Sequence, residues 1–299
     1  MINDNNTLPI IHWRFPEAAK FGRVIPKEKL YQQANVSTAL KQRFVEQVGQ
    51  IKWAYKLAEG TTNLSKTKSV TEIEIIHITL KSKDLDENIL AAIDKAIPHP
   101  TLFILKRYQN HQSNDKSNNY SNDTEQKKAT EQICITAAHK VKGNTASGKE
   151  TWQQSQYLNS AWFQPTQVKD MPLPTATNLQ RLYEQLLEAL IPSSLDRDKN
   201  SPERITNSSE PNINSSDDTS SQISESKAHY NINEKHQTET INQPIEEKLA
   251  TLAEIETLNK KLQQVKAKRD KEKQFNRRRE LNDDYKALIK QLAQLQAKI

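Results

Sequence analysis

Apolar residues in the first two thirds of the chain change between helical and extended spacing. After Ser37, a candidate N-cap, they recur at steps of three and four, at Leu40, Phe44, Val48, Ile51 and Tyr55. A single stripe of this kind predicts an amphipathic helix, the longest of its domain. Residues 70–80 are instead rich in β-branched residues, which predicts a strand that is solvated at one end and buried at the other.

The pattern continues with one helix, three strands and a last helix. Residues 84–97 combine a capping-box pattern with an apolar stripe, which predicts a helix that Pro98 ends. An apolar stripe after Asn178 predicts the last helix. The three extended segments are 101–106, 132–141 and 151–163. This order favours a small α/β or α+β domain with a mixed sheet, over residues 24–192.

Two polar tracts and a short leading segment divide the chain. Residues 109–131 are mostly Asn, Gln, Ser, Asp and Lys, as expected for an insertion in a surface loop. Residues 193–244 contain few bulky apolar residues, so they cannot bury enough surface to offset the entropy cost of ordering. We therefore expect a disordered linker there, and an N-terminal arm over residues 1–23.

The last segment, residues 245–299, contains neither proline nor glycine. Leucine and isoleucine recur at steps of three and four in both of its halves, which predicts coiled coil. The centre has few apolar residues, so two arrangements stay open. One is a single long helix, and the other is a helical hairpin that folds back at residues 270–276, with Asn276 as the cap of the second helix.

Positive charge is concentrated in the centre of this segment. Residues 260–279 hold ten basic and two acidic residues. The net charge of this stretch, ten minus two or +8, exceeds the net charge of +6 of the whole chain. Such a density is typical of a surface that binds phosphate or an acidic partner, although a solvated helical face also explains it. The candidate residues for binding nucleic acid or a partner are Lys266, Lys268, Arg269, Lys271, Lys273, Phe275, Arg277, Arg278 and Arg279.

Composition excludes several classes of protein. The 299 residues include only five glycines, too few and too scattered for a dinucleotide-binding fingerprint. One cysteine cannot form a disulfide framework or a thiolate zinc cluster within the chain. No stretch of about 18 apolar residues occurs, so we expect a cytoplasmic protein that does not contact a membrane. No cofactor is expected either.

A metal-dependent nuclease or related hydrolase is the main enzymatic alternative. Glu72 and Glu74 are two residues apart on one strand and therefore share a face, with Lys81 at the end of the same strand. Carboxylates and a lysine near strand ends can hold a metal ion and activate water. Alternating charge on a half-exposed strand is the commoner explanation. His99, between Pro98 and Pro100, is explained by a rigid turn.

Five segments together resemble domain-of-unknown-function family 4391, an uncharacterised bacterial group. They are VIPKEKLY (24–31), LKQRFVEQVGQIKWAYKLA (40–58), TEIEIIHITL (71–80), LDENILAAIDKAIPHPTLFIL (85–105) and EKQFNRRRELN (272–282). The resemblance supplies no catalytic residues. It implies that such proteins are encoded together with DNA methyltransferases, helicases and restriction-type nucleases in bacterial defence or mobile loci.

The leading hypothesis is therefore a non-catalytic accessory or adaptor subunit of a bacterial DNA-processing system. Its α/β domain would dock a helicase, methyltransferase or restriction-type subunit, and its coiled coil would provide a second contact, to protein or to DNA. Two further functions stay open: the metal-dependent hydrolase described above and a stand-alone nucleic-acid-binding protein. A homo-oligomer formed through the coiled coil also stays open.

Overall fold

The computed structural model describes residues 8–109, 129–144, 150–192 and 243–299. The chain divides into two compact units, Met1–Pro192 and Ser193–Ile299, and each is described by itself. Most of the expected loop insertion at 109–131 and of the expected linker at 193–244 lies outside the described residues.

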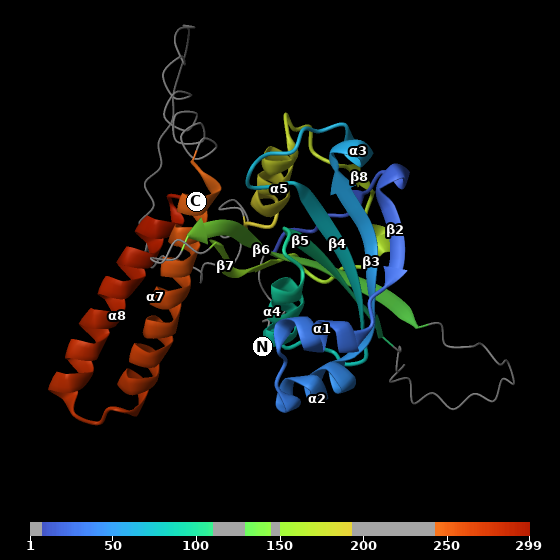
Figure 1. The fold of residues 1–299 in the computed structure, drawn as a ribbon. Coiled ribbons are helices and arrows are strands. Elements are labelled where there is room, and N and C mark those ends of the chain that lie inside the picture. The colour runs from blue at the N-terminus through green and yellow to red at the C-terminus, as the bar shows by residue number, and fades with distance from the viewer. Residues whose placement is uncertain (1–7, 110–128, 145–149, 193–242) are drawn as a thin grey trace, which may run out of the picture. The chain divides into compact units, whose positions relative to one another are not determined.

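The first unit is built on a six-stranded mixed sheet with the order β2-β3-β4-β5-β6-β7 (Figure 1). Its strands are β2 (Lys20–Val24), β3 (Val48–Ala58), β4 (Glu72–Leu80), β5 (Thr101–Gln109), β6 (Thr130–Asn144) and β7 (Glu150–Asn159). Only β4 and β5 are parallel, and every other neighbouring pair is antiparallel. The mixed sheet expected from the sequence is therefore confirmed.

The helices of the first unit occupy both sides of this sheet. They are α1 (Lys27–Ala34), α2 (Thr38–Gln47), α3 (Glu59–Thr62), α4 (Glu87–Ala96) and α5 (Leu179–Glu188), with short 3₁₀ turns at Glu17–Ala19 and Pro165–Gln167. Helix α4 connects the parallel strands β4 and β5, as a parallel pair requires a crossover. Two short strands, β1 (Trp13–Arg14) and β8 (Met171–Pro172), pair in parallel apart from the main sheet.

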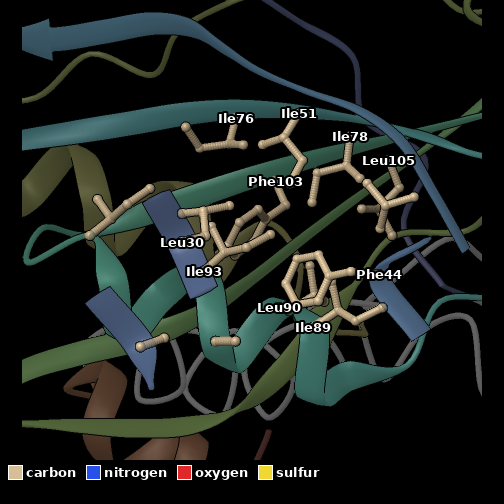
Figure 2. Close-up of a cluster of buried hydrophobic side chains, with 14 of the residues drawn as sticks. Leu30, Phe44, Ile51, Ile76, Ile78, Ile89, Leu90, Ile93, Phe103 and Leu105 are labelled. Atoms are coloured by element: carbon tan, nitrogen blue, oxygen red, sulfur yellow. The ribbon is translucent and has the colours of Figure 1, made fainter. Parts of the chain in front are cut away.

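The main hydrophobic core lies between the sheet and helices α1, α2 and α4 (Figure 2). Leu30, Phe44 and Ile93 come from these three helices, and Ile76 and Phe103 come from the central strands. All five side chains are at most 2% exposed. At about 1.5–3 kcal/mol for each large side chain, this burial is the main source of stability for the sheet and its helical layer.

Helix α5 packs on the other face of the sheet, against β4 and β6. Its buried residues Leu179, Leu182 and Leu186 follow the stripe expected from the sequence, and Asn178 caps it by accepting a hydrogen bond from the Arg181 N–H. Tyr183 is also buried, and its hydroxyl donates to the carbonyl of Ala138 in β6.

The prediction of one long helix after Ser37 is wrong for the residues that follow Gln47. Ser37 does cap a helix, because its Oγ accepts from the Leu40 N–H, but that helix ends at Gln47. Residues 48–58 form β3, in which every third residue is buried. Register shifts near residues 49 and 54 mark bulges in the pairing with β4, and each bulge changes the face on which the next side chain lies. A doubly bulged strand therefore shows a spacing that resembles a helix.

The second unit contains two helices, α7 (Ile245–Lys271) and α8 (Phe275–Gln296), that pack against each other (Figure 1). Of the two arrangements left open by the sequence, the structure has the hairpin. Gln274 is the N-cap of α8, so the expected cap at Asn276 is wrong. In the part of the chain that the structure describes, no helix is both long enough and apolar enough to cross a membrane.

Candidate functional site

The turn of the hairpin carries the basic residues expected to bind a partner. Residues 266–279, which we name the hairpin tip, comprise the end of α7, the connection 272–274 and the start of α8. Phe275 is 79% exposed. The other candidate residues of the tip are exposed, except for Arg269, which is half-buried. The structure thus brings the sequence-predicted residues together around one turn.

The basic residues on the two sides of the turn differ in their surroundings. Arg269 in α7 lies over the ring of Tyr285, 4.7 Å from its centroid, and forms an ion pair with Asp270 at 3.0 Å. Arg277 and Arg278 lie in the first turns of α8, which has no acidic residue in its first turn. Arg269 is therefore held within the hairpin, whereas the acidic residues of α8 begin only after its arginines, at Glu280.

A second candidate site lies in the first unit, where two carboxylates meet a histidine. Glu72 and Glu74 come from the start of β4, and His99 precedes β5. One ligand atom of each lies within 4.8 Å of the others. Lys56 Nζ lies 2.5 Å from Glu72 Oε2, and the indole N–H of Trp53 donates to Glu74 Oε2 at 2.5 Å. We name Glu72, Glu74 and His99 the Glu–Glu–His cluster.

The topology of the sheet accounts for this cluster. Because β4 and β5 are parallel, the residue that precedes β5 returns to the end of the sheet where β4 begins. The Glu74 N–H donates to the carbonyl of Pro100 at 2.8 Å, and His99 Nε2 lies 2.9 Å from Glu72 Oε1. On the neighbouring strand β3, the bulge near residue 54 places Trp53 and Lys56 on the same face of the sheet as the two glutamates, within contact of them.

Glu74 is unusual because its carboxyl group is fully buried. Burial raises the pKa of Glu74 to about 8, and the neighbouring Glu72 adds to this, while the hydrogen bond from Trp53 opposes it. Only Oε2 accepts a hydrogen bond, and Oε1 has no hydrogen-bond partner among the described residues. A buried carboxylate oxygen without a partner is costly, so Glu74 needs a proton or a cation.

The cluster differs from the one expected from the sequence. Lys81 lies at the far end of β4, seven residues from Glu74, or about 23 Å along a strand. Its Nζ donates to the carbonyl of Val45 in α2 at 2.9 Å. The grouping of Glu72 and Glu74 with Lys81 is therefore wrong. Sequence reasoning assigned His99 only to a turn, although its place directly before a strand that follows a crossover helix was the available signal.

A groove of about 400 Å³ gives access to the cluster. Glu72 and His99 form part of its lining, together with Trp53 and the basic side chains of Arg23 and Lys29. Arg23 and Lys29 are exposed, so an anion that approaches the cluster meets positive charge at the groove.

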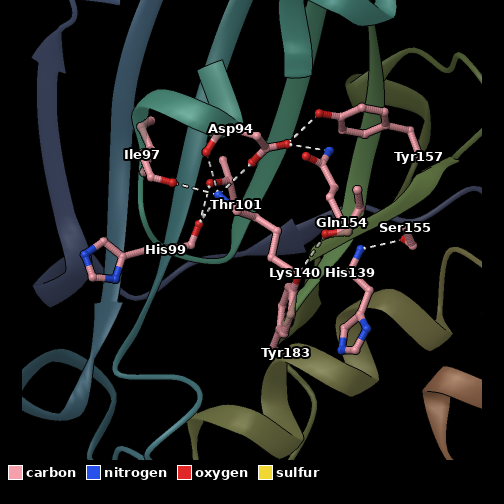
Figure 3. Close-up of polar contacts among 11 residues, drawn as sticks. Asp94, Ile97, His99, Thr101, His139, Lys140, Gln154, Ser155, Tyr157 and Tyr183 are labelled. Carbon is pink, nitrogen blue, oxygen red and sulfur yellow. Dashed lines mark hydrogen bonds and ion pairs between the residues drawn. The ribbon is translucent and has the colours of Figure 1, made fainter. Parts of the chain in front are cut away.

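A buried polar network lies directly behind His99 (Figure 3). The ammonium of Lys140 in β6 donates to the carbonyls of Asp94, Ile97 and His99 at 2.8, 2.7 and 2.9 Å. It also lies 3.3 Å from Asp94 Oδ1. Lys140 thereby satisfies carbonyl groups at the carboxyl end of α4 that the helix itself leaves without donors.

The carboxylate of Asp94 has further donors in this network. Tyr157 donates its hydroxyl to Asp94 Oδ2 at 2.6 Å, and the amide of Gln154 donates at 3.2 Å. Burial raises the pKa of Asp94 and lowers that of Lys140, while the attraction between the two acts in the opposite direction on each. The network holds the 97–99 turn, and hence His99, in a fixed position.

A cavity of about 750 Å³ lies on the other face of the sheet, lined in part by His12, Tyr55, His77 and Lys106. Nε2 of His77 has no hydrogen-bond partner among the described residues. Burial lowers the pKa of His77 to about 4, and the charges of Lys106 and Lys52 contribute. The imidazole of His77 is therefore neutral at neutral pH.

Comparison with known proteins identifies the family and nothing more. No curated protein matches the chain, and no solved structure matches it. The family described as "Domain of unknown function (DUF4391)" matches residues 14–292, which include the whole six-stranded sheet, the Glu–Glu–His cluster and the hairpin tip. Because the match extends over nearly the entire chain, the chain belongs to the DUF4391 family.

Proposed function

We propose that this chain is an accessory subunit of a bacterial DNA-processing system and that its hairpin tip binds nucleic-acid phosphates. The observation that carries the proposal is the position of Arg277, Arg278 and Arg279 at the start of α8. Exposed arginines that follow one another on a helix point in directions about 100° apart, so they can contact a curved, charged strand.

The helix dipole does not explain these arginines. The amino end of a helix carries a partial positive charge, so each cation in the first turn costs a few tenths of a kcal/mol up to about 1 kcal/mol. At the end of α7 the situation is reversed, because Lys268, Arg269 and Lys271 lie where cations stabilise a helix. The helix dipole therefore explains the three cations in the last turn of α7 but not the arginines of α8, which we propose contact a ligand.

Phe275 places an exposed aromatic ring at the tip, which binding of phosphates by charge alone does not require. A large apolar ring that is 79% exposed, two residues before the first of three arginines, can stack on an unpaired base. Stacking on aromatic side chains contributes about 1–3 kcal/mol per base in proteins that bind single strands. This favours contact with single-stranded or locally opened DNA over contact with an intact duplex.

The proposed accessory role has two further parts. We propose that the packed helices α7 and α8 form a short antiparallel coiled coil and that the α/β unit docks a helicase, methyltransferase or restriction-type subunit in the cytoplasm. Coiled-coil spacing on both helices supports the first part. A partner bound by one unit and DNA bound by the other would reinforce each other through effective concentration.

DNA binding by a triple variant and a matched control tests the proposal. Arg277→Gln, Arg278→Gln and Arg279→Gln together remove three charges from the tip. Lys286→Gln, Lys290→Gln and Lys298→Gln remove three exposed charges from elsewhere in the second unit, so the change in net charge is the same. Fluorescence anisotropy with labelled single-stranded and duplex DNA, over a range of salt concentrations, gives the affinity and its salt dependence.

We expect the tip variant to lose affinity and the control to retain most of it. On duplex DNA, the slope of log affinity against log salt should fall by about 2 to 3 in the tip variant, since each phosphate contact contributes about 0.9. Phe275→Ala should weaken binding to single-stranded DNA more than binding to duplex. Equal weakening in both triple variants, or no binding by the full chain, would refute a phosphate-binding tip.

A further inference from the structure

The Glu–Glu–His cluster has the composition of a metal site. Two carboxylate oxygens and one imidazole nitrogen lie within 4.8 Å of one another, at the open end of the sheet beside a groove of about 400 Å³. We propose that Glu72, Glu74 and His99 bind a divalent transition-metal ion, of which zinc and manganese are the representative cases.

The distances suit such an ion after small rotations of the side chains. Zinc lies about 2.1 Å from carboxylate oxygens and imidazole nitrogens, so two ligands of a tetrahedral ion are about 3.4 Å apart. His99 Nε2 and Glu72 Oε1 are 2.9 Å apart, close to this spacing. All three ligand atoms lie within 4.8 Å of one another, so rotations of the side chains can bring them to this spacing. The imidazole favours a transition metal over calcium or magnesium, which prefer oxygen ligands alone.

The orphaned oxygen of Glu74 is a second observation that a bound cation would explain. Glu74 is 0% exposed, and its Oε1 is buried without a hydrogen-bond partner among the described residues. The indole of Trp53 accounts only for Oε2. A buried acceptor without a donor destabilises the fold, and coordination of a metal ion by Oε1 would remove this cost.

The surroundings hold the ligands in place. The carbonyl of His99 accepts a hydrogen bond from Lys140, and prolines on both sides of His99 restrict its backbone. Trp53 orients the Glu74 carboxylate. Groups that orient metal ligands in this way commonly account for tenfold to hundredfold differences in affinity.

Replacement of Lys56 distinguishes a metal site from a simple network of ion pairs. Its ammonium lies 2.5 Å from Glu72 Oε2, where it partly neutralises the two carboxylates. If the cluster binds a metal ion, Lys56 competes for Glu72 and repels the cation. Removal of this lysine should therefore tighten metal binding, whereas in a network of ion pairs it would only destabilise the fold.

Isothermal titration calorimetry of the full chain, freed of metal with a chelator, provides the test. We would titrate zinc chloride, manganese chloride and calcium chloride separately into the wild type and into Glu74→Gln, His99→Ala and Lys56→Met. Glu46→Gln, on the exposed surface of α2, serves as the matched carboxylate control. Tryptophan fluorescence verifies that each variant is folded.

One zinc-binding event should disappear in Glu74→Gln and His99→Ala and persist in Glu46→Gln. In Lys56→Met, its affinity should rise by at least about tenfold. Manganese should bind at the same site, and calcium should bind much more weakly. Unchanged zinc stoichiometry in Glu74→Gln and His99→Ala would overturn the proposal. So would weaker or equal zinc binding in Lys56→Met, which remains informative if the other two variants do not fold.

Discussion

Replacement of Lys140 by methionine should destabilise the α/β unit strongly. Methionine keeps most of the length of the side chain but has no ammonium. The Lys140 side chain is 2% exposed, and that of Asp94 is 1% exposed, so water cannot replace the lost group. Three carbonyls lose their donor, at Asp94, Ile97 and His99, and the Asp94 carboxylate loses its cation.

The magnitude follows from what remains after the change. Removal of one partner from a buried ion pair typically costs 3–5 kcal/mol, because the other charge stays buried without compensation. Tyr157 and Gln154 still donate to Asp94, and Asp94 can also take up a proton, since burial already raises its pKa. The three carbonyls without a donor add to the loss and these effects offset part of it, so we expect about 3–5 kcal/mol in total. That is a large part of the 5–15 kcal/mol that stabilises a typical domain.

Asp94→Asn provides the informative comparison. The amide keeps the shape of the side chain, and Lys140 keeps its three carbonyl acceptors, so we expect a smaller loss of about 1–3 kcal/mol. The double variant should lose less than the sum of the two single losses, because each single change leaves an unpaired charge. Lys95→Met, at an exposed position in the last turn of α4, is the control and should change stability by less than about 1 kcal/mol.

Urea unfolding followed by tryptophan fluorescence measures these differences. The four tryptophans, Trp13, Trp53, Trp152 and Trp162, all belong to the first unit, so the signal reports on that unit in the full chain. A loss below about 1 kcal/mol for Lys140→Met would refute the reasoning. An equal loss for Asp94→Asn would also refute it, because the three carbonyl contacts would then contribute nothing.

Two further predictions concern other buried groups. His77 has a pKa of about 4 in the folded chain against about 6.5 when unfolded, so its contribution is present above pH 6.5 and is lost as the pH falls towards 4. Between pH 7 and 4.5 the wild type should lose about 2 kcal/mol relative to His77→Phe in urea unfolding, and parallel profiles would contradict this. Burial raises the pKa of the Cys134 thiol to about 11, so a thiol reagent should label Cys134 slowly at pH 8 and rapidly in urea. Rapid labelling of the folded chain would contradict the buried position.

The sequence by itself determined the elements whose signals are local. The apolar stripe of α5 and its Asn178 cap, and the β-branched run of β4, predicted the right element at nearly the right residues. The hairpin was one of two arrangements predicted for the last segment, and the nine candidate residues of the tip lie around its turn. These predictions hold because caps, spacing and composition act within one element, whatever packs against it.

Only the tertiary structure decided how distant residues meet. The bulges of β3 arise in its pairing with β4, so neither the strand nor the shared face of Trp53 and Lys56 could be inferred from spacing. The parallel pairing of β4 with β5 brings His99 to Glu72, and the length of β4 keeps Lys81 away from both glutamates. Lys140 completes the end of a helix that precedes it by more than forty residues. Such contacts depend on strand register and on burial of charge, which a local pattern of residues does not encode.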